Sequence, residues 1–578
     1  MAQGILQLAL FCALVVAAVP VLGAHMARVF TGERTVLDPL SGRLERGTYR
    51  LLGVDPVHAQ TWKAYARSVL LFSAAGWLLL FLILRTQTLH PLNPAGFHSA
   101  PWDVTFNTVS SFVTNTNWQF YGGETTMTYV SQAVGLTVQN FVSAAVGMSV
   151  AVALIRAIAQ RRATGGAAPN GGGAEATIGN FWQDLTRAIT HVLLPIAFVA
   201  ALVLVAQGVL QTLGATTGGI ARGPVASQEA IKELGTNGGG FFNVNSAHPF
   251  ENPTAFSNLV EMFLIMAIPA SLTATYGRMV GSRRQGWAIF GAMSLLFLVS
   301  VAVVFAAERH GTPAQHLAGL HGGNLEGKEL RNGTTMSSLF AAVTTVTSCG
   351  AVNAAMQSLT GIGGLVPLAN MAYGESVFGG VGTGLYTMLL YVLLAVFIGG
   401  LMVGRTPEFL GKKIEAREIK LVSLGVLATP LLVLLGSGLA LATRYGAPSI
   451  YATGPQGFSE TLYAYMSQAN NNGSAFAGYT GFLQPDAGNL GSHGVTFADV
   501  VGGLVMLGGR FLPILIVLAI AGSLAGKRVA PIGAGTLRTD TGTFGGLLVG
   551  VVVLIGALTF FPALLLGPVV QGLTTHLF

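Results

Sequence analysis

The sequence Gly235-Thr-Asn-Gly-Gly-Gly-Phe-Phe242 contains one of four short stretches rich in Thr, Asn, Ser and Gly that lie between apolar segments. The four stretches are Thr114–Asn117, Thr236–Gly240, Thr347–Gly350 and Asn470–Ser474. If Asn115, Asn237, Cys349 and Asn472 are taken as equivalent positions, the spacings between them are 122, 112 and 123 residues. Near-constant spacing of this size is typical of internal repeats. The sequence therefore predicts a fourfold repeated architecture.

Ten apolar segments surround these stretches, and most contain the roughly 20 apolar residues that are needed to cross the hydrocarbon core of a bilayer. The predicted membrane spans are residues 4–24, 68–84, 130–155, 188–212, 262–277, 285–307, 376–404, 421–443, 500–526 and 544–568. Each of the four stretches lies between two spans, which leaves the first and last spans outside the repeats. We therefore expect an all-α polytopic membrane protein with about ten transmembrane helices. Four parallel span–pore-loop–span repeats would surround a pseudo-fourfold pore.

The repeats also suggest how the chain is divided. The expected units are residues 1–60 (first span and cytoplasmic loop), 61–160, 180–284, 285–418 and 419–530 (repeats 1 to 4), and 531–578 (last span). The Gly/Ala-rich stretch from Thr164 to Ala176 belongs to no motif and is expected to be a flexible loop.

Composition and charge agree with a membrane protein. Of 578 residues, 52% are hydrophobic and 9% are charged, whereas a soluble domain has roughly 25% charged residues. The net charge of +7 is not interpreted as nucleic-acid binding, because 22 of the 30 Lys and Arg residues lie in the loops after spans 1, 3, 5, 7 and 9. By the positive-inside rule that side is cytoplasmic, so both termini are expected in the periplasm. The opposite loops hold only seven basic residues, among them Lys232 and Lys328.

The four stretches are predicted to form a cation filter. Segments 104–113 and 334–346, which precede two of them, are too short to span a bilayer and suit a short descending helix. Non-helical backbone at membrane depth is tolerated only where it lines a polar cavity. Glycines permit the dihedral angles that aligned carbonyls require, and such oxygens can replace the hydration shell of a cation. Ordinary Asn/Gly turns are the alternative, and four copies on the same side at even spacing disfavour them.

The residues expected to line the filter come from all four stretches. They are Val113, Thr114, Asn115, Thr116, Thr236, Asn237, Gly238, Thr347, Ser348, Cys349, Gly350, Asn471, Asn472 and Gly473. Only Cys12 and Cys349 are cysteines, and no Cys/His cluster has metal-ligand spacing, so neither a disulfide framework nor a zinc site is expected.

Ionisable residues within predicted spans are further candidates for function. Arg510 interrupts the ninth span, and Glu375 follows the third filter stretch and begins the seventh span. For both we favour a structural network that holds the pore helices, with direct ion handling as the alternative. Glu261 stands near the start of the fifth span, where a carboxylate favours the helix N-terminus.

Several motifs resemble the KdpA family, the potassium-binding subunits of bacterial Kdp potassium-transporting ATPases. The segments that carry the resemblance are Phe112–Gln119, Gly235–Phe242, Thr347–Val352, Asn471–Phe476, Gly374–Gly380, Gly404–Glu408 and Gly411–Lys413. The resemblance covers essentially the whole chain. It implies potassium as the substrate ion, no organic cofactor, and a bacterial inner-membrane complex with the P-type ATPase subunit KdpB, with KdpC and with the small KdpF. Potassium would enter the filter from the periplasm and pass through an intramembrane tunnel to KdpB. Membrane lipid would surround the spans.

The chain itself is expected to be non-catalytic. It has no GxxxxGK[ST] loop, and Thr539-Asp-Thr-Gly-Thr543 lacks the lysine that follows the phosphorylated aspartate of P-type ATPases. Asp540 is therefore interpreted as a plain polar loop residue. A Trk/Ktr-like channel or symporter subunit, which shares the four repeats and needs no pump, remains the alternative. A membrane enzyme is disfavoured because the spans contain no clustered His/Asp/Glu set.

The seventh predicted span, 376–404, is unusually long and contains Gly379-Gly380, Gly382, Gly384 and Gly399-Gly400. Glycines weaken helix continuity, and in the resembling family the third inner helix is interrupted by a loop that obstructs the exit below the filter. Arg405 follows at the cytoplasmic end, where its charge could raise a barrier to a cation. The alternative is that Arg405 only anchors the span at the lipid headgroups.

Overall fold

The computed structural model describes residues 2–160, 176–214, 220–402, 404–481, 492–530 and 537–574. Ten helical segments of this part of the chain are long and apolar enough to cross a membrane, which confirms the predicted number of spans. Strands are few: β1 (Gln60–Thr61) pairs with β2 (Thr177–Gly179), and β3 (Glu408–Phe409) with β4 (Lys412–Lys413), both antiparallel. Residues 164–175 of the expected Gly/Ala-rich loop lie outside the described residues.

Four consecutive units share the order long helix, short helix, long helix. The first contains α3 (Trp62–Arg85), α4 (Trp102–Val113) and η2–α6 (Ser131–Thr137, Val138–Ala159). The second contains α7–η3–α8 (Phe181–Arg187, Ala188–Leu193, Leu194–Gln207), α9 (Val225–Leu234) and α10 (Ala255–Met279). The third contains α11 (Arg283–His310), α13 (Gly333–Val346), α14 (Gly361–Ala372) and α15 (Thr383–Met402), and the fourth α16 (Ala416–Ala442), α17 (Gly454–Ala469) and α18 (Ser492–Ala525).

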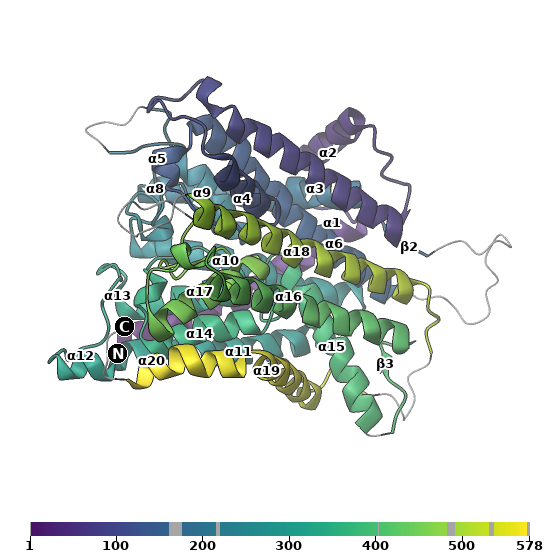
Figure 1. Ribbon diagram of the computed structural model, residues 1–578. Coiled ribbons are helices and arrows are strands. Elements are labelled where there is room, and N and C mark those ends of the chain that lie inside the picture. The colour runs from purple at the N-terminus through teal and green to yellow at the C-terminus, as the bar shows by residue number, and fades with distance from the viewer. Residues whose placement is uncertain are drawn as a thin grey trace.

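The remaining helices flank or connect these units. They are α1 (Ala2–Thr31), α2 (Asp38–Leu52), η1 (Gln87–Leu89), α5 (Gly123–Thr126), η4 (Asn245–Ala247), α12 (Pro313–Leu317), η5 (Met356–Ser358), η6 (Ala447–Ser449), α19 (Gly542–Leu564), η8 (Leu565–Val569) and α20 (Val570–Leu573). In Figure 1 both chain ends lie at one end of the helix bundle, next to α12, whereas α2 and β3 lie toward the opposite end. A chain that crosses the membrane an even number of times has both of its ends on the same side.

Burial separates an inner from an outer layer of spans. In α6, α10, α15 and α18, the second long helix of each repeat, 83%, 72%, 61% and 61% of the most apolar window is buried. In the first long helices, α3, α7–α8, α11 and α16, the shares are 22%, 44%, 50% and 39%. The second helices therefore form the inner layer, and α1, buried over only 17% of its window, lies outside. Small residues allow α1 to approach α10 closely, since Gly23 lies against Ser271 and Ala274.

The third repeat departs from the predicted span boundaries. Residues 376–404 do not form one helix: α15 begins at Thr383, and the backbone from Tyr373 to Gly382 is not helical. The short apolar helix α14 (Gly361–Ala372) precedes this break and was not predicted. The break itself agrees with the glycine pattern, because Gly379 and Gly382 adopt φ values of 63° and 91°, which side chains disfavour.

Candidate functional site

The four predicted filter stretches fold alike, each at the C-terminal end of a short helix. An amide in each stretch donates to the carbonyl five residues earlier: Thr116 to Ser111, Asn237 to Lys232, Cys349 to Thr344 and Asn472 to Ser467, at 2.9, 2.7, 3.0 and 2.8 Å. The residue before each donor has a positive φ, with values of 68°, 48°, 48° and 49° at Asn115, Thr236, Ser348 and Asn471. Because the negative end of a helix dipole lies at its C-terminus, the four helix ends favour a cation between them.

This geometry corrects the predicted correspondence in the first repeat. Thr116, not Asn115, is equivalent to Asn237, Cys349 and Asn472. Asparagine tolerates the left-handed conformation better than most residues, so Asn115 takes the position that Thr236 occupies in the second stretch. Asparagines flank Thr116 on both sides, at positions 115 and 117, and this explains why the sequence alone suggested the wrong register.

A second positive φ follows two residues later and brings the stretches together. It belongs to Asn117, Gly238, Gly350 and Gly473, at 53°, 80°, 100° and 97°. A Cβ atom on any of these three glycines would lie well under 3.0 Å from the carbonyl oxygen of the next stretch. Those oxygens belong to Cys349, Asn472 and Thr116, respectively. The second stretch is therefore next to the third, the third to the fourth, and the fourth to the first.

Side chains close the ring between the first and second stretches. The Asn115 amide donates to the carbonyl of Thr236 at 2.9 Å, and Asn237 Nδ2 donates to Asn115 Oδ1 at 2.6 Å. The inner helix α6 supports this junction, since Ser143 Oγ donates to Asn115 Oδ1 at 2.7 Å and Asn117 Nδ2 donates to Asn140 Oδ1 at 2.7 Å. These contacts complete a closed ring of four backbone segments.

A cavity of about 620 Å³ opens onto this ring. Its lining includes the four structurally equivalent residues Asn117, Gly238, Gly350 and Gly473, one from each stretch. Most of the remaining lining comes from the loops that follow the short helices, within residues 243–247, 352–357 and 474–480, and Gly327, Lys328 and Glu329 contribute from the segment before α13. An ion that reaches the ring through this cavity therefore meets one residue of each of the four stretches.

The structure brings most of the predicted filter residues together and adds others. Thr114 and Thr347 lie where α4 and α13 end, and Val113 is the last residue of α4. Their equivalents in the other repeats, Gly235 and Asn470, were not among the predicted site residues. The predicted set also lacks Asn117, although its place two residues after Asn115 matches that of Gly238 after Thr236.

The break in the third repeat lies directly beneath the ring. Gly379 donates its amide to the carbonyl of Val346, at the end of α13, at 2.8 Å, and Val381 donates to Thr236 Oγ1 at 2.9 Å. Glu375 belongs to this loop, not to a span as predicted, and its Oε2 has no hydrogen-bond partner in the described structure. The loop therefore contacts the second stretch and the end of the helix that precedes the third stretch.

The predicted charged residues have different surroundings. Arg510 is buried and donates to the carbonyl of Ser143 at 3.0 Å, which links α18 to α6 beside the ring. In the described residues neither Arg510 nor Glu375 takes part in an ion pair within 4.0 Å. Arg405 is exposed beyond the end of α15. That helix has 20 residues and is about 30 Å long, so Arg405 is not brought to the ring.

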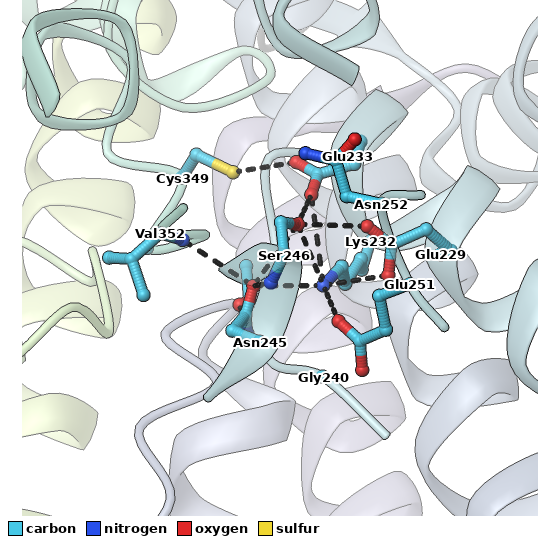
Figure 2. A network of polar contacts seen from close by, with 12 residues as sticks. Glu229, Lys232, Glu233, Gly240, Asn245, Ser246, Glu251, Asn252, Cys349 and Val352 are labelled. Carbon is cyan, nitrogen blue, oxygen red and sulfur yellow. Dashed lines mark hydrogen bonds and ion pairs between the residues drawn. The ribbon is translucent and has the colours of Figure 1, made fainter. Parts of the chain in front are cut away.

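A buried ion-pair network behind the second stretch was missed by the sequence analysis (Figure 2). Lys232, which was counted among outer-loop residues, lies on α9 and is 0% exposed. Its Nζ lies 2.8 Å from Glu229 Oε2, 2.8 Å from Glu251 Oε2 and 2.9 Å from Asn245 Oδ1. Three charged residues within the eleven before Thr236 were the available signal. Lys328, also assigned to an outer loop, is likewise buried and pairs with Glu308 at 2.7 Å.

Asn245 connects this network to the ring. Its Nδ2 donates to the carbonyl of Gly238 at 2.6 Å, while its Oδ1 accepts from Lys232 and from the amide of Val352. Cys349 Sγ donates to Glu233 Oε2 at 3.5 Å. The second and third stretches thus rest on the ionic cluster (Figure 2).

Asp540 lies away from the ring, in the loop before α19. Arg538 donates two hydrogen bonds of 3.1 Å to its carboxylate and holds the pKa of Asp540 below its usual value. This pairing agrees with the interpretation of Asp540 as a polar loop residue.

Comparisons with known proteins agree with the sequence motifs. The family model described as KdpA, Potassium-transporting ATPase A subunit, matches residues 9–573. A Potassium-transporting ATPase potassium-binding subunit of Methylobacterium radiotolerans is 55% identical over 580 residues, covering 99% of this chain and 97% of the relative. One of the same description from Rhizobium rhizogenes is 53% identical over 581 residues, covering 99% and 98%. The crystal structure of the potassium transporter TrkH from Vibrio parahaemolyticus superposes with a TM-score of 0.51 at 14% identity, covering 90% of this chain and 98% of TrkH.

Proposed function

The chain belongs to the KdpA family of potassium-transporting ATPase A subunits, and we propose that it binds potassium at the four-stretch ring for uptake by an ATP-driven complex. The observation that carries the proposal is the closed ring itself, with one equivalent residue of each stretch facing a 620 Å³ cavity. Carbonyl oxygens at the C-terminal ends of four helices supply the partial negative charge that replaces the hydration shell of a cation.

Potassium enters from the periplasm through the cavity, and both termini lie on that side. Both chain ends lie at one end of the bundle (Figure 1), and the distribution of the basic loops supports this orientation by the positive-inside rule. The ligands are the predicted filter residues, with Asn117, Gly235 and Asn470 added from the structural equivalence. The membrane is the bacterial inner membrane.

Beneath the ring, the Tyr373–Gly382 loop blocks a straight path to the cytoplasm. A small cavity of about 30 Å³ lies beside this loop, and its lining includes Glu375, Tyr386, Thr429 and Asn470. We propose that this cavity begins a lateral route toward the ATPase subunit. Such a route lets the P-type subunit couple each ion to ATP hydrolysis, since a straight pore would dissipate the gradient.

The chain performs no catalysis of its own and needs no organic cofactor; the partners are KdpB, KdpC and KdpF. The relatives at 53–55% identity are named as ATPase subunits, while the 14% identity with TrkH relates the two folds alone. The Trk/Ktr-like alternative is therefore not retained.

The experiment is purification of the tagged chain from its native membrane in mild detergent. We expect a P-type ATPase to copurify, and potassium at micromolar concentration to stimulate its phosphorylation-dependent ATP hydrolysis. The chain without partners should bind potassium and form no phosphoenzyme, and Asp540→Asn should leave phosphorylation of the complex unchanged. A potassium-conducting chain that copurifies with no ATPase would refute the proposal.

A further inference from the structure

The carboxylates around Lys232 outnumber the basic groups that face them. Glu229, Glu233, Glu251 and Glu261 are all 0–1% exposed. In the described residues Lys232 is the only basic partner of this cluster: its Nζ lies 2.8, 3.7 and 2.8 Å from the first three carboxylates. Four carboxylates and one ammonium group leave an excess of three negative charges if every group is ionised. Buried charges of this kind require a partner, since their desolvation is costly.

Glu261 shows where the missing partner belongs. It lies on α10 and is completely buried, and neither of its carboxylate oxygens has a hydrogen-bond partner among the described residues. Its carboxylate is directed at Glu229 and Glu233, because one oxygen from each of the three side chains lies within 4.8 Å of the others. Ser246 Oγ lies 2.9 Å from Glu229 Oε1 and 3.1 Å from Glu233 Oε1, so it contributes a fourth oxygen.

We propose that Glu229, Glu233 and Glu261 bind a hard divalent cation such as Ca²⁺ behind the second filter stretch. Calcium accepts six to eight oxygen ligands at about 2.3–2.6 Å, so two of its ligands lie up to about 5 Å apart. The 4.8 Å limit on the three carboxylate oxygens matches this span. A divalent ion reduces the excess charge from three to one, whereas a monovalent ion leaves two. Potassium filters use neutral carbonyl oxygens instead of clustered carboxylates.

The site is joined to the ring through the surrounding network (Figure 2). Glu233 accepts from Cys349 Sγ, and Lys232, which pairs with Glu229, also contacts Asn245, whose amide holds the carbonyl of Gly238. A cation that fixes Glu229 and Glu233 therefore fixes the second and third stretches. This consequence rests on the proposed potassium function, whereas binding of the divalent cation does not depend on it.

The test measures binding of radioactive Ca²⁺, and of Mn²⁺ by its paramagnetic resonance spectrum, to the purified full-length chain after chelation. We expect one site per chain that is lost or weakened about tenfold or more in Glu261→Gln, because ligand charge sets the affinity of oxygen-ligand calcium sites. Glu233→Gln should have the same effect. Glu460→Gln is the matched control: Glu460 is buried on α17 with one unpartnered oxygen but belongs to no carboxylate cluster of the described residues.

Each outcome distinguishes the occupants. If the wild-type chain binds neither Ca²⁺ nor Mn²⁺, the proposal is overturned, and protons instead of a metal ion neutralise the carboxylates of the cluster. Displacement of Ca²⁺ by micromolar potassium would assign a monovalent ion instead, and full binding in folded Glu261→Gln and Glu233→Gln would place the metal elsewhere. If Glu261→Gln and Glu233→Gln lose Ca²⁺ binding but retain potassium binding, the result supports the metal site but not its effect on the ring. A chain that binds Ca²⁺ but not potassium would refute the proposed function and leave the metal site standing.

Discussion

Substitution of Gly350 by serine should weaken potassium binding without preventing folding of the chain. Gly350 has a φ of 100°, and a Cβ atom there would lie well under 3.0 Å from the carbonyl oxygen of Asn472. Either the carbonyl moves by about 1 Å or more, or the backbone of residue 350 changes its conformation. Strained backbone of this kind costs about 1–3 kcal/mol per residue. If the ring relieves this strain only in the ion-free state, potassium binding must restore the strain. The cost of about 1–3 kcal/mol then lowers the potassium affinity by roughly 5- to 150-fold.

The assay is the potassium concentration that half-saturates ATP hydrolysis by the assembled complex, measured with potassium, rubidium and sodium. Gly281→Ser is the matched control, because Gly281 has a φ of 76° between α10 and α11 and nothing lies within 4 Å of its Cβ position. That control carries the same kind of backbone strain away from the ring and should retain wild-type affinity. Wild-type affinity and selectivity in folded Gly350→Ser would refute the assignment of the ring as the filter.

Four further outcomes are expected. Asn117→Gly should weaken potassium affinity by roughly 2- to 10-fold, which is less than the effect of Gly350→Ser. The substitution keeps the backbone conformation and removes one hydrogen bond, to Asn140, that contributes about 0.5–1.5 kcal/mol. An effect as large as that of Gly350→Ser would contradict this reasoning. Deletion of Gly380 should open a passive potassium leak in proteoliposomes without ATP. Arg405 is exposed and is separated from the loop by the length of α15, about 30 Å. If the loop is the barrier, proteoliposomes with Arg405→Ala should not leak potassium. A leak in that variant alone would make the arginine the gate. Burial lowers the pKa of Lys412 to about 8, so above pH 8 the unfolded chain binds more protons and stability rises toward pH 10.5. The midpoint temperature of thermal unfolding of the wild type should therefore rise relative to that of Lys412→Met between pH 7.5 and 10. If the two midpoints change with pH in parallel, the lowered pKa of Lys412 is disproved.

The filter positions illustrate how far a sequence can be interpreted. Gly238, Gly350 and Gly473 were predicted to permit the unusual backbone conformation of the filter, and all three have positive φ. The first repeat has no glycine there, and Asn117 adopts the same conformation with its side chain bonded to Asn140 on α6. A substitute whose support comes from another helix leaves no local pattern, so the register of that repeat could not be assigned from its own residues.

Charged residues show the opposite limit. Lys232 directly follows the apolar pair Ala230-Ile231, and its position in the sequence suggested an exposed loop. The structure buries it because Glu229, on its own helix, and Glu251, 19 residues later, both reach its ammonium group. Glu261 was assigned to a helix N-terminus, and only the packing of α10 against α9 brings it toward Glu229 and Glu233.

The sequence by itself determined the ten spans, the four repeats and the short helices that precede the filter. These features depend on local properties: the length of an apolar run is matched to the thickness of the bilayer, and a short semi-polar run cannot cross it. Tertiary structure alone decided the ring, in which the Asn471 amide contacts Thr116 across 355 residues of chain. It also decided which residues the loop beneath the ring contacts, and it assembled the carboxylate cluster behind the ring. Each of these depends on which distant segments meet, and the hydropathy of a segment carries no information about its neighbours in space.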